Sequence, residues 1–311
     1  MRDQYALQTN QKQMGYTKTP VGIIGQGFVG TAVRVGLDNE FNVMTYDKYE
    51  TNKTTHQPAE ILRKCEVVFV CVPTPMDLET GECHTGIVES VVAELDALAT
   101  LLHDAGELNH PITLVVKSTV PPGTTKFLND HRSEYVNVTF NPEFLTEANA
   151  IQDFMNQDRI ILGGEPAALE PVVDVFQTAF PGVPIQTTDS TTAEMVKYTT
   201  NTFLSVKVSF ANEIYDLCEA SHVDYSKMIE LAKLDKRLGN SHWMVPGPDG
   251  DRGFGGHCFP KDLTALRYVA SQFEVQTPVL DGANETNNRV RANRDWEEQE
   301  GRAVINKLQV K

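Results

Sequence analysis

The amino-acid sequence predicts an α/β protein, in which a Rossmann-like, doubly wound parallel sheet is followed by a helical central domain. From about residue 20 to residue 188, short apolar stretches alternate with amphipathic ones, which is the pattern of parallel strands joined by helices. From Thr191 the pattern changes to 30 residues without Pro or Gly, which indicates one long helix. We therefore expect a polar tail over residues 1–19, a sheet domain over 20–188 and a helical domain over 189–311.

Composition and charge exclude several classes of protein. At 311 residues the chain suits one large or two medium domains, and none of its apolar runs approaches the ~20 residues of a membrane helix. The five cysteines show no paired spacing, which argues against a disulfide framework or metal site and for a reducing compartment. The net charge of −15 disfavours nucleic acid as a partner. We expect a soluble, cytoplasmic protein, and residues 1–19 lack the apolar core of a signal peptide.

A glycine-rich turn follows the first expected strand, at residues 21–24. The turn opens a helix that runs to about Leu37, and Asp47 ends the next strand about 20 residues further on. This is the fingerprint of a dinucleotide site, in which the diphosphate lies on the helix N-terminus. Asp47 would accept hydrogen bonds from ribose hydroxyls and repel a 2′-phosphate, so NAD is favoured over NADP, with Lys48 moderating the preference. The turn consists of Gly25, Gln26, Gly27, Phe28, Val29 and Gly30.

Further strands and helices continue the sheet pattern. The strands are expected at 67–72, 112–117, 136–140, 159–162 and 184–187, and the helices at 86–104, 124–133 and 166–180. Polar residues follow the ends of three of these strands. Because ligands gather at the carboxyl ends of parallel strands, we expect these residues to line one crevice. They are Thr74, Ser118, Thr119, Glu143 and Glu147.

The stretch from Gly253 to Asp262 is the strongest candidate for chemistry. Three of its first four residues are glycines, which leaves a backbone on which a ligand can lie directly. Pro260 marks the start of a helix. Cys258 therefore falls at a helix N-terminus, where the helix dipole and the Lys261 ammonium favour a nucleophilic thiolate. The other four cysteines are expected to be buried apolar residues.

The long helix places Lys197 and Asn201 on one face, because the two are four residues apart. Taken alone, a lysine on a helix is usually solvated. Shorter helices are expected at about 225–234, 263–273 and 296–309.

With these motifs, in this order and at this spacing, the sequence resembles the UDP-glucose/GDP-mannose 6-dehydrogenases from about residue 20 to residue 290. A series of motifs is far more specific than any one of them. The resemblance is carried by residues 25–30 (GQGFVG), 71–75 (CVPTP), 118–124 (STVPPGT), 141–147 (NPEFLTE), 193–197 (AEMVK) with Asn201, Asn212 and Glu213, and 253–262 (GFGGHCFPKD).

The resemblance implies an NAD-dependent enzyme that oxidises the C6 alcohol of a nucleotide sugar twice, converting UDP-glucose to UDP-glucuronate. Cys258 would attack the aldehyde, the thiohemiacetal would be oxidised to a thioester, and water would hydrolyse the thioester. Lys197 and Asn201 correspond to groups that stabilise negative charge on the C6 oxygen. Groups that position water and move protons correspond to Asp262, Thr119, Glu143 and Glu147.

The resemblance also implies contacts with the two ligands. Cofactor contacts beyond the turn and Asp47 are implied for Lys48, Pro73, Thr74, Ser118 and Thr119. Substrate contacts are implied for Glu143, Phe144, Leu145, Lys197, Asn201, Arg252, Phe254, Gly255, Gly256 and Lys261. Because the family dimerises through its central helices, a homodimer is expected.

The chain departs from the family at its C-terminus. Members usually carry a third, UDP-binding domain, and this sequence stops at Lys311. We expect that the first two domains and a partner subunit hold the nucleotide, that another chain supplies the domain, or that activity is weak. Alternative interpretations are a GDP-mannose 6-dehydrogenase, a 3-hydroxyacid or phosphogluconate-type reductase, which needs no nucleophilic cysteine, and a non-catalytic module that binds NAD or a sugar nucleotide.

Overall fold

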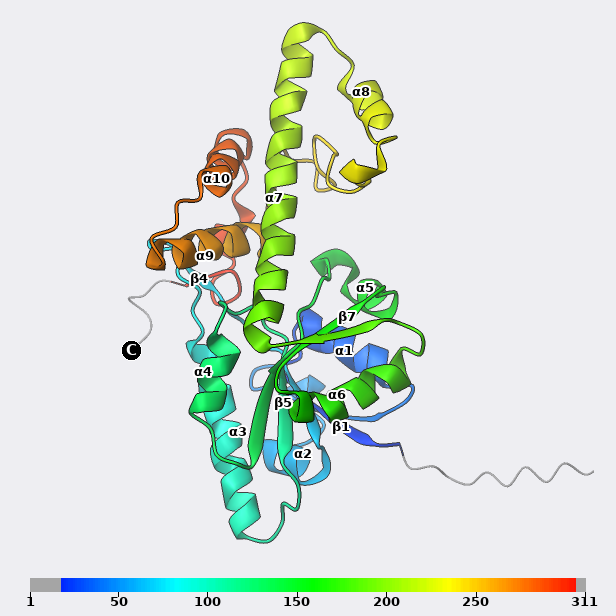
Figure 1. Ribbon diagram of the computed structural model, residues 1–311, viewed down its shortest axis with the longest axis vertical. Helices are drawn as coiled ribbons and strands as arrows, with labels where there is room; N and C mark the ends of the chain where they lie inside the picture. The colour runs from blue at the N-terminus through cyan, green and yellow to red at the C-terminus, as the bar shows by residue number, and fades with distance from the viewer. Residues whose placement is uncertain (1–17, 306–311) are drawn as a thin grey trace, which may run out of the picture.

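The structure is a computed structural model that describes residues 18–305. The expected polar tail therefore lies almost wholly outside the described residues, as does the end of the helix expected at 296–309. A seven-stranded sheet forms one part of the molecule, and the long helix α7 (Ser190–Ser221) projects from it (Figure 1). Within residues 18–305, no helix combines the length and apolarity needed to cross a membrane.

The sheet is parallel except at one pair of neighbours. Its strands, in spatial order, are β2 (Asn42–Tyr46), β1 (Pro20–Ile24), β3 (Val67–Val70), β5 (Ile112–Val116), β6 (Val136–Phe140), β7 (Ile160–Gly163) and β8 (Ile185–Thr188). β7 meets β6 in the antiparallel sense, through Phe140 and Gly163. The predicted parallel sheet is confirmed apart from this pair, which is antiparallel because residues 141–159 return to the sheet at the edge they left instead of crossing it.

Helices cover both faces of the sheet, and each face has its own apolar core. Because successive side chains of a strand point to opposite faces, Val68 and Val70 belong to one core and Phe69 to the other. The first core lies under α2 (Pro58–Lys64), α3 (Gly86–Asp104) and α4 (Thr124–Asp130). The second lies under α1 (Phe28–Leu37), α5 (Ala150–Met155) and α6 (Pro166–Ala179). This two-sided burial confirms the doubly wound sheet.

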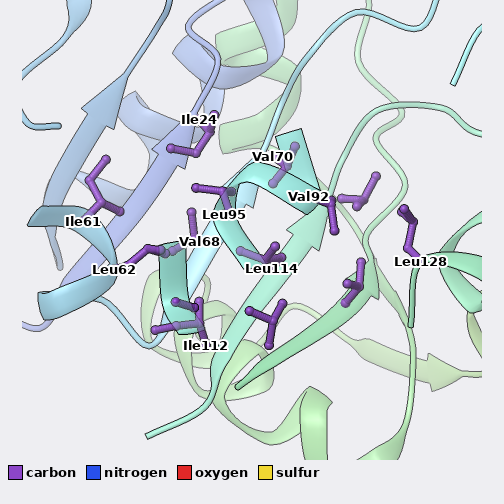
Figure 2. Close-up of a cluster of buried hydrophobic side chains, with 14 of the residues drawn as sticks. Ile24, Ile61, Leu62, Val68, Val70, Val92, Leu95, Ile112, Leu114 and Leu128 are labelled. Atoms are coloured by element: carbon purple, nitrogen blue, oxygen red, sulfur yellow. The ribbon is translucent and has the colours of Figure 1, made fainter. Parts of the chain in front are cut away.

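Figure 2 shows the first of these cores. Leu62 from α2, Leu95 from α3 and Leu128 from α4 lie over strand residues such as Leu114. Burying a side chain of this size stabilises a fold by about 1.5–3 kcal/mol, so this face anchors the strands whose carboxyl ends carry the polar residues discussed below.

The helical part begins with α7, as expected. Asp189 caps its first turn, accepting a hydrogen bond from the Thr192 N–H at 2.9 Å. Beyond it lie α8 (Tyr225–Ala232), α9 (Cys258–Gln272) and α10 (Pro278–Val290), of which α9 and α10 pack against α7 (Figure 1). α10 was not expected from the sequence.

The described C-terminal segment is not the helix expected from residue 296. A 3-10 turn (Asp295–Glu298) leads to strand β9 (Val304–Ile305), which pairs with β4 (Met76–Asp77) in a separate two-stranded sheet. Trp296 and Val304 pack on Met76, and Gly301 has φ of +74°, which a helix does not accommodate. The segment folds back over the sheet domain. The remaining 3-10 turns are Thr51–Lys53, Glu147–Asn149 and Lys236–Leu238.

Candidate active site

A cleft of about 1720 Å³ lies at the carboxyl ends of β1, β3, β5 and β6. Its wall joins the glycine-rich turn to the start of α9, although the two are more than 200 residues apart in the sequence. The predicted residues that line it are Gly25, Gln26, Gly27, Phe28, Val29, Asp47, Lys48, Pro73, Thr74, Ser118, Thr119, Glu143, Glu147, Cys258, Lys261 and Asp262. The crevice predicted from the strand ends is therefore present, and Cys258 lies in it.

The turn after β1 has the geometry of a dinucleotide site. Gly25 has φ of +92°, and a Cβ on Gly30 would lie 1.9 Å from the Gly25 carbonyl oxygen, so α1 packs closely on the turn. A Cβ on Gly27 would meet nothing within 4 Å. Gly27 thus leaves open space at the N-terminus of α1, whose backbone N–H groups attract anions.

Asp47 is held by backbone donors at the end of β2. Its Oδ2 accepts from the Gln26 N–H at 2.6 Å, and its Oδ1 from the N–H groups of Tyr49 and Glu50 at 2.9 and 2.8 Å. Partial burial disfavours the charged form, but the hydrogen bonds from Glu50, Gln26 and Tyr49 and the nearby Lys53 outweigh it and lower the pKa of Asp47. The carboxylate is a fixed negative charge at the cleft.

Lys53 is a second lysine at this corner, which the sequence did not indicate. Its Nζ donates to the Gln26 carbonyl at 3.2 Å, because the 3-10 turn of residues 51–53 folds back toward the glycine-rich turn. Lys48 is exposed. Both lysines line the cleft, so the cation beside the Asp47 carboxylate is Lys53 as well as the expected Lys48.

The long helix α7 contributes a buried ammonium. Lys197 Nζ donates to the Glu143 carbonyl at 2.5 Å and to its Oε1 at 3.0 Å. Burial alone lowers the pKa of Lys197, but the carboxylates of Glu143 and Asp262 outweigh burial and raise it. The amine therefore remains a cation behind the wall of the cleft.

Asp262 joins α9 to α7. Its Oδ2 accepts from Asn201 Nδ2 at 2.6 Å, and its Oδ1 accepts from Lys261 Nζ at 2.5 Å. Lys261 is buried. Burial lowers its pKa, but the effect of the Asp262 carboxylate is opposite and contributes to a net rise in that pKa. The structure thus brings the predicted set together. Lys197 and Asn201 do not line the cleft themselves, but they donate hydrogen bonds to Glu143 and Asp262, which do.

Cys258 is the first residue of α9, as the sequence indicated. Burial raises the pKa of the Cys258 thiol to about 12, and Glu143 acts in the same direction, outweighing Lys197 and Lys261. The expectation that the helix N-terminus favours a thiolate is therefore wrong for this structure. The resting group is a thiol, and a nucleophilic role for it would require a base.

Several predicted substrate contacts do not line the cleft. Arg252 pairs with Asp216 at 2.7 Å and donates from Nε to Asn212 Oδ1 at 3.1 Å. Its neighbour Phe254 is buried, and the Phe254 backbone exchanges hydrogen bonds with the Asn287 side chain at 2.8 and 3.0 Å. The other predicted substrate contacts missing from the cleft wall are Phe144, Leu145, Gly255, Gly256, Lys197 and Asn201.

Besides Lys53, the structure adds three residues that the sequence analysis did not assign. Lys117, at the end of β5, donates to Asn141 Oδ1 at 2.6 Å, and burial lowers its pKa to about 8. His257 contacts Cys258, and Arg302 reaches the cleft from the segment before β9. Only His257 lay within a predicted motif, where its place next to Cys258 was a signal. Within residues 18–305, no group of three or more His, Cys, Asp or Glu residues is arranged to hold a metal ion.

Comparison with known proteins places these observations in one family. Residues 46–179 match the model of the NAD-binding domain of the UDP-glucose/GDP-mannose dehydrogenase family, and residues 191–289 match the model of the central domain of the same family. The UDP-glucose 6-dehydrogenase of Rickettsia bellii is 33% identical over 253 residues, which are 78% of this chain and 55% of that protein. The chain spans about half the length of the curated relatives it matches.

Solved structures give the same result. A UDP-glucose dehydrogenase from Pyrobaculum islandicum superposes with a TM-score of 0.77 at 26% identity, covering 89% of this chain and 69% of that one. A GDP-mannose dehydrogenase from Pseudomonas aeruginosa superposes with a TM-score of 0.62 at 26% identity, covering 87% and 68%. With two domains of one family matched in order, the chain belongs to the UDP-glucose/GDP-mannose dehydrogenase family, and its N-terminal part is that family's NAD-binding domain.

Proposed function

We propose that the protein is an NAD-dependent nucleotide-sugar 6-dehydrogenase that oxidises UDP-glucose to UDP-glucuronate. The observation that carries the proposal is the shared cleft of Cys258 and the glycine-rich turn, since a hydride acceptor and a nucleophile must reach the same carbon. NAD, when bound, accepts hydride from that carbon. The similarity to proteins named UDP-glucose dehydrogenase supports the choice of substrate.

The residues around the turn fit NAD. Open space at Gly27 and the N-terminus of α1 suit a diphosphate. The Asp47 carboxylate suits a ribose with free hydroxyls and repels a 2′-phosphate. Residues 20–188 would thus hold the cofactor, and residues 189–311 would carry the nucleophile.

In the proposed reaction C6 first loses a hydride and its hydroxyl proton, which gives an aldehyde. The Cys258 sulfur then adds to the aldehyde carbon, the thiol proton leaves, and the carbonyl oxygen takes up a proton. Loss of a second hydride and of the hydroxyl proton leaves a thioester on Cys258. Water displaces the sulfur, so that a carboxylate is released and the thiol is restored.

The buried polar groups would serve these steps. Lys197, kept charged by Glu143, and the Asn201 amide would stabilise negative charge on the C6 oxygen. Asp262 and Thr119 line the same cleft as Cys258, where they would position water. Lys261 neutralises Asp262 and would support substrate binding.

We also propose a homodimer that forms through α7. Phe203, Phe210 and Leu217 are 64%, 51% and 62% exposed, and they are seven residues apart, so they lie on one side of the helix. An apolar stripe of this kind is typical of an interface. The five free cysteines, of which four are buried and Cys258 is partly exposed, support the cytoplasm as its compartment.

The test is to count NADH formed per sugar consumed with UDP-glucose, GDP-mannose and UDP-N-acetylmannosamine in turn. The proposal predicts two NADH per UDP-glucose. Two NADH only with GDP-mannose would instead support the alternative substrate, which the likeness to a GDP-mannose dehydrogenase favours. Cofactor binding without NADH formation from any of the three would contradict the proposal and indicate a non-catalytic binding module.

A further inference from the structure

His257 lies between the thiol of Cys258 and a carboxylate. Its Nε2 is 3.5 Å from Cys258 Sγ, and its Nδ1 is 3.1 Å from Glu147 Oε2. A carboxylate only accepts hydrogen bonds, so Nδ1 carries the ring proton and donates a hydrogen bond to Glu147. In the neutral ring, Nε2 then has a free lone pair, and that lone pair is directed at the thiol.

Contacts with other parts of the chain hold the His257 ring and the Glu147 carboxylate in place. The Phe28 ring of the glycine-rich turn meets the His257 ring edge-on, with centroids 5.1 Å apart. Glu147 also accepts from Arg302 at 2.5 Å. Partial burial disfavours ionised Glu147, but Arg302 and His257 outweigh it and lower its pKa. The carboxylate is therefore charged, and its position depends on the segment that precedes β9.

The other charged groups facing Cys258 are less suited to take its proton. Lys197 and Lys261 are cations with raised pKa values. The carboxylates of Glu143 and Asp262 already accept hydrogen bonds from those two lysines. In the described part of the chain, His257 is the hydrogen-bond partner found for this sulfur.

We propose that His257 is the base that takes the proton of the Cys258 thiol, and that Glu147, itself held by Arg302, is the residue that positions the His257 ring. The S–H bond breaks as sulfur bonds to carbon, and an N–H bond forms at Nε2. The resulting imidazolium is stabilised by Glu147 and returns the proton when sulfur leaves. The proposal rests on the proposed function for its substrate, but the proton transfer requires only these side chains.

Two features of the environment favour transfer during attack over a preformed ion pair. Burial raises the pKa of Cys258 to about 12, and burial, with Lys261 and Arg302, lowers the pKa of His257 against the effect of Glu147 and Glu143. Thiol and neutral imidazole are thus the resting forms, which is the state that general-base catalysis requires.

The test measures alkylation of Cys258 by iodoacetamide, followed by peptide mass spectrometry, from about pH 5 to about pH 11. In the unchanged protein the rate should rise through an inflection below the ordinary histidine pKa and then level off. His257→Asn keeps a side-chain N–H but has no base. It should lower the rate near neutral pH by about 100-fold, remove the inflection, and approach the unchanged protein only in strong alkali.

Two further variants separate the roles. Glu147→Gln should move the inflection to lower pH, because the neutral amide no longer stabilises the imidazolium. His257→Ala should regain alkylation when free imidazole is added. His222→Asn is the matched control and should behave like the unchanged protein, because His222 is exposed at the end of α7 and does not line the cleft.

Coincident pH profiles for the unchanged protein and a folded His257→Asn variant would overturn the proposal, as would the absence of imidazole rescue. An unmoved inflection in Glu147→Gln would overturn the positioning role. Alkylation needs neither NAD nor a sugar nucleotide. A normal alkylation profile in a protein that forms no NADH would therefore contradict the proposed function and leave the His257 inference standing.

Discussion

The Lys197 ammonium lies 3.0 Å from the Glu143 carboxylate, and both groups are buried between α7 and the end of β6. This ion pair joins the helical part of the molecule to the sheet. It also holds the polypeptide at one wall of the cleft, since the same ammonium donates to the Glu143 carbonyl.

The ion pair should make a large contribution to stability when only one partner is removed. Lys197→Met leaves the Glu143 carboxylate buried without its cation and should lower the free energy of unfolding by about 3–5 kcal/mol. Adding Glu143→Gln should recover part of that loss. Urea unfolding of both single variants and the double variant measures this. A loss under about 1 kcal/mol for Lys197→Met, as in exposed ion pairs, would contradict the account.

Two glycines of the turn give a matched pair of substitutions. Gly27→Ala places a Cβ in open space, so it should leave thermal stability nearly unchanged while lowering NAD affinity tenfold or more, about 1.4 kcal/mol. Gly30→Ala places a Cβ 1.9 Å from the Gly25 carbonyl oxygen and should destabilise the fold. Calorimetric titration with NAD and thermal melts provide the comparison. Unchanged NAD affinity in Gly27→Ala would show that NAD does not bind at the glycine-rich turn.

Lys117 predicts a pH dependence of stability. Burial lowers its pKa from 10.5 to about 8, so between these values the unfolded chain binds a proton that the native state does not. Stability should therefore rise with pH across this window, relative to Lys117→Met, which lacks the titration. Urea unfolding of both proteins at several pH values tests the difference. A difference that stays constant from about pH 7 to about pH 10 would contradict a neutral buried amine.

The α7 stripe predicts the oligomeric state. Phe203→Glu should convert a dimer to a monomer in sedimentation analysis, because it places a carboxylate at an apolar contact. Phe273→Glu is the control, since Phe273 is 73% exposed and belongs to the C-terminal end of α9 instead of α7. A monomeric unchanged protein would refute the dimer, and dissociation by both variants would show that the stripe is not special.

Local patterns predicted most of the sheet domain. α3 occupies the predicted residues 86–104. It could be predicted because a long amphipathic pattern identifies a helix without any knowledge of tertiary contacts. α10 was missed because its sequence, PVLDGANETNNRV, is mostly polar. It is fixed by contacts distant in sequence, such as Ser209 Oγ donating to the Ala283 carbonyl at 2.8 Å.

The site divides in the same way. The motifs indicated Cys258, Lys197, Asn201 and Asp262 together, and the structure brings them to one region. The ionisation of Cys258 was mispredicted, because its pKa depends on burial under side chains from other elements. Arg252, predicted as a substrate contact, does not line the cleft, because its partners, Asp216 and Asn212, lie on α7.

The most direct test of the central claim is to look for the covalent intermediate on Cys258. A reaction with NAD and UDP-glucose is stopped with acid during turnover, and the digested protein is analysed by mass spectrometry. We predict a sugar-nucleotide adduct on the peptide that contains Cys258, which disappears when UDP-glucose is omitted and in Cys258→Ala. Sustained formation of two NADH per sugar by Cys258→Ala, with no adduct in the unchanged protein, would contradict the account.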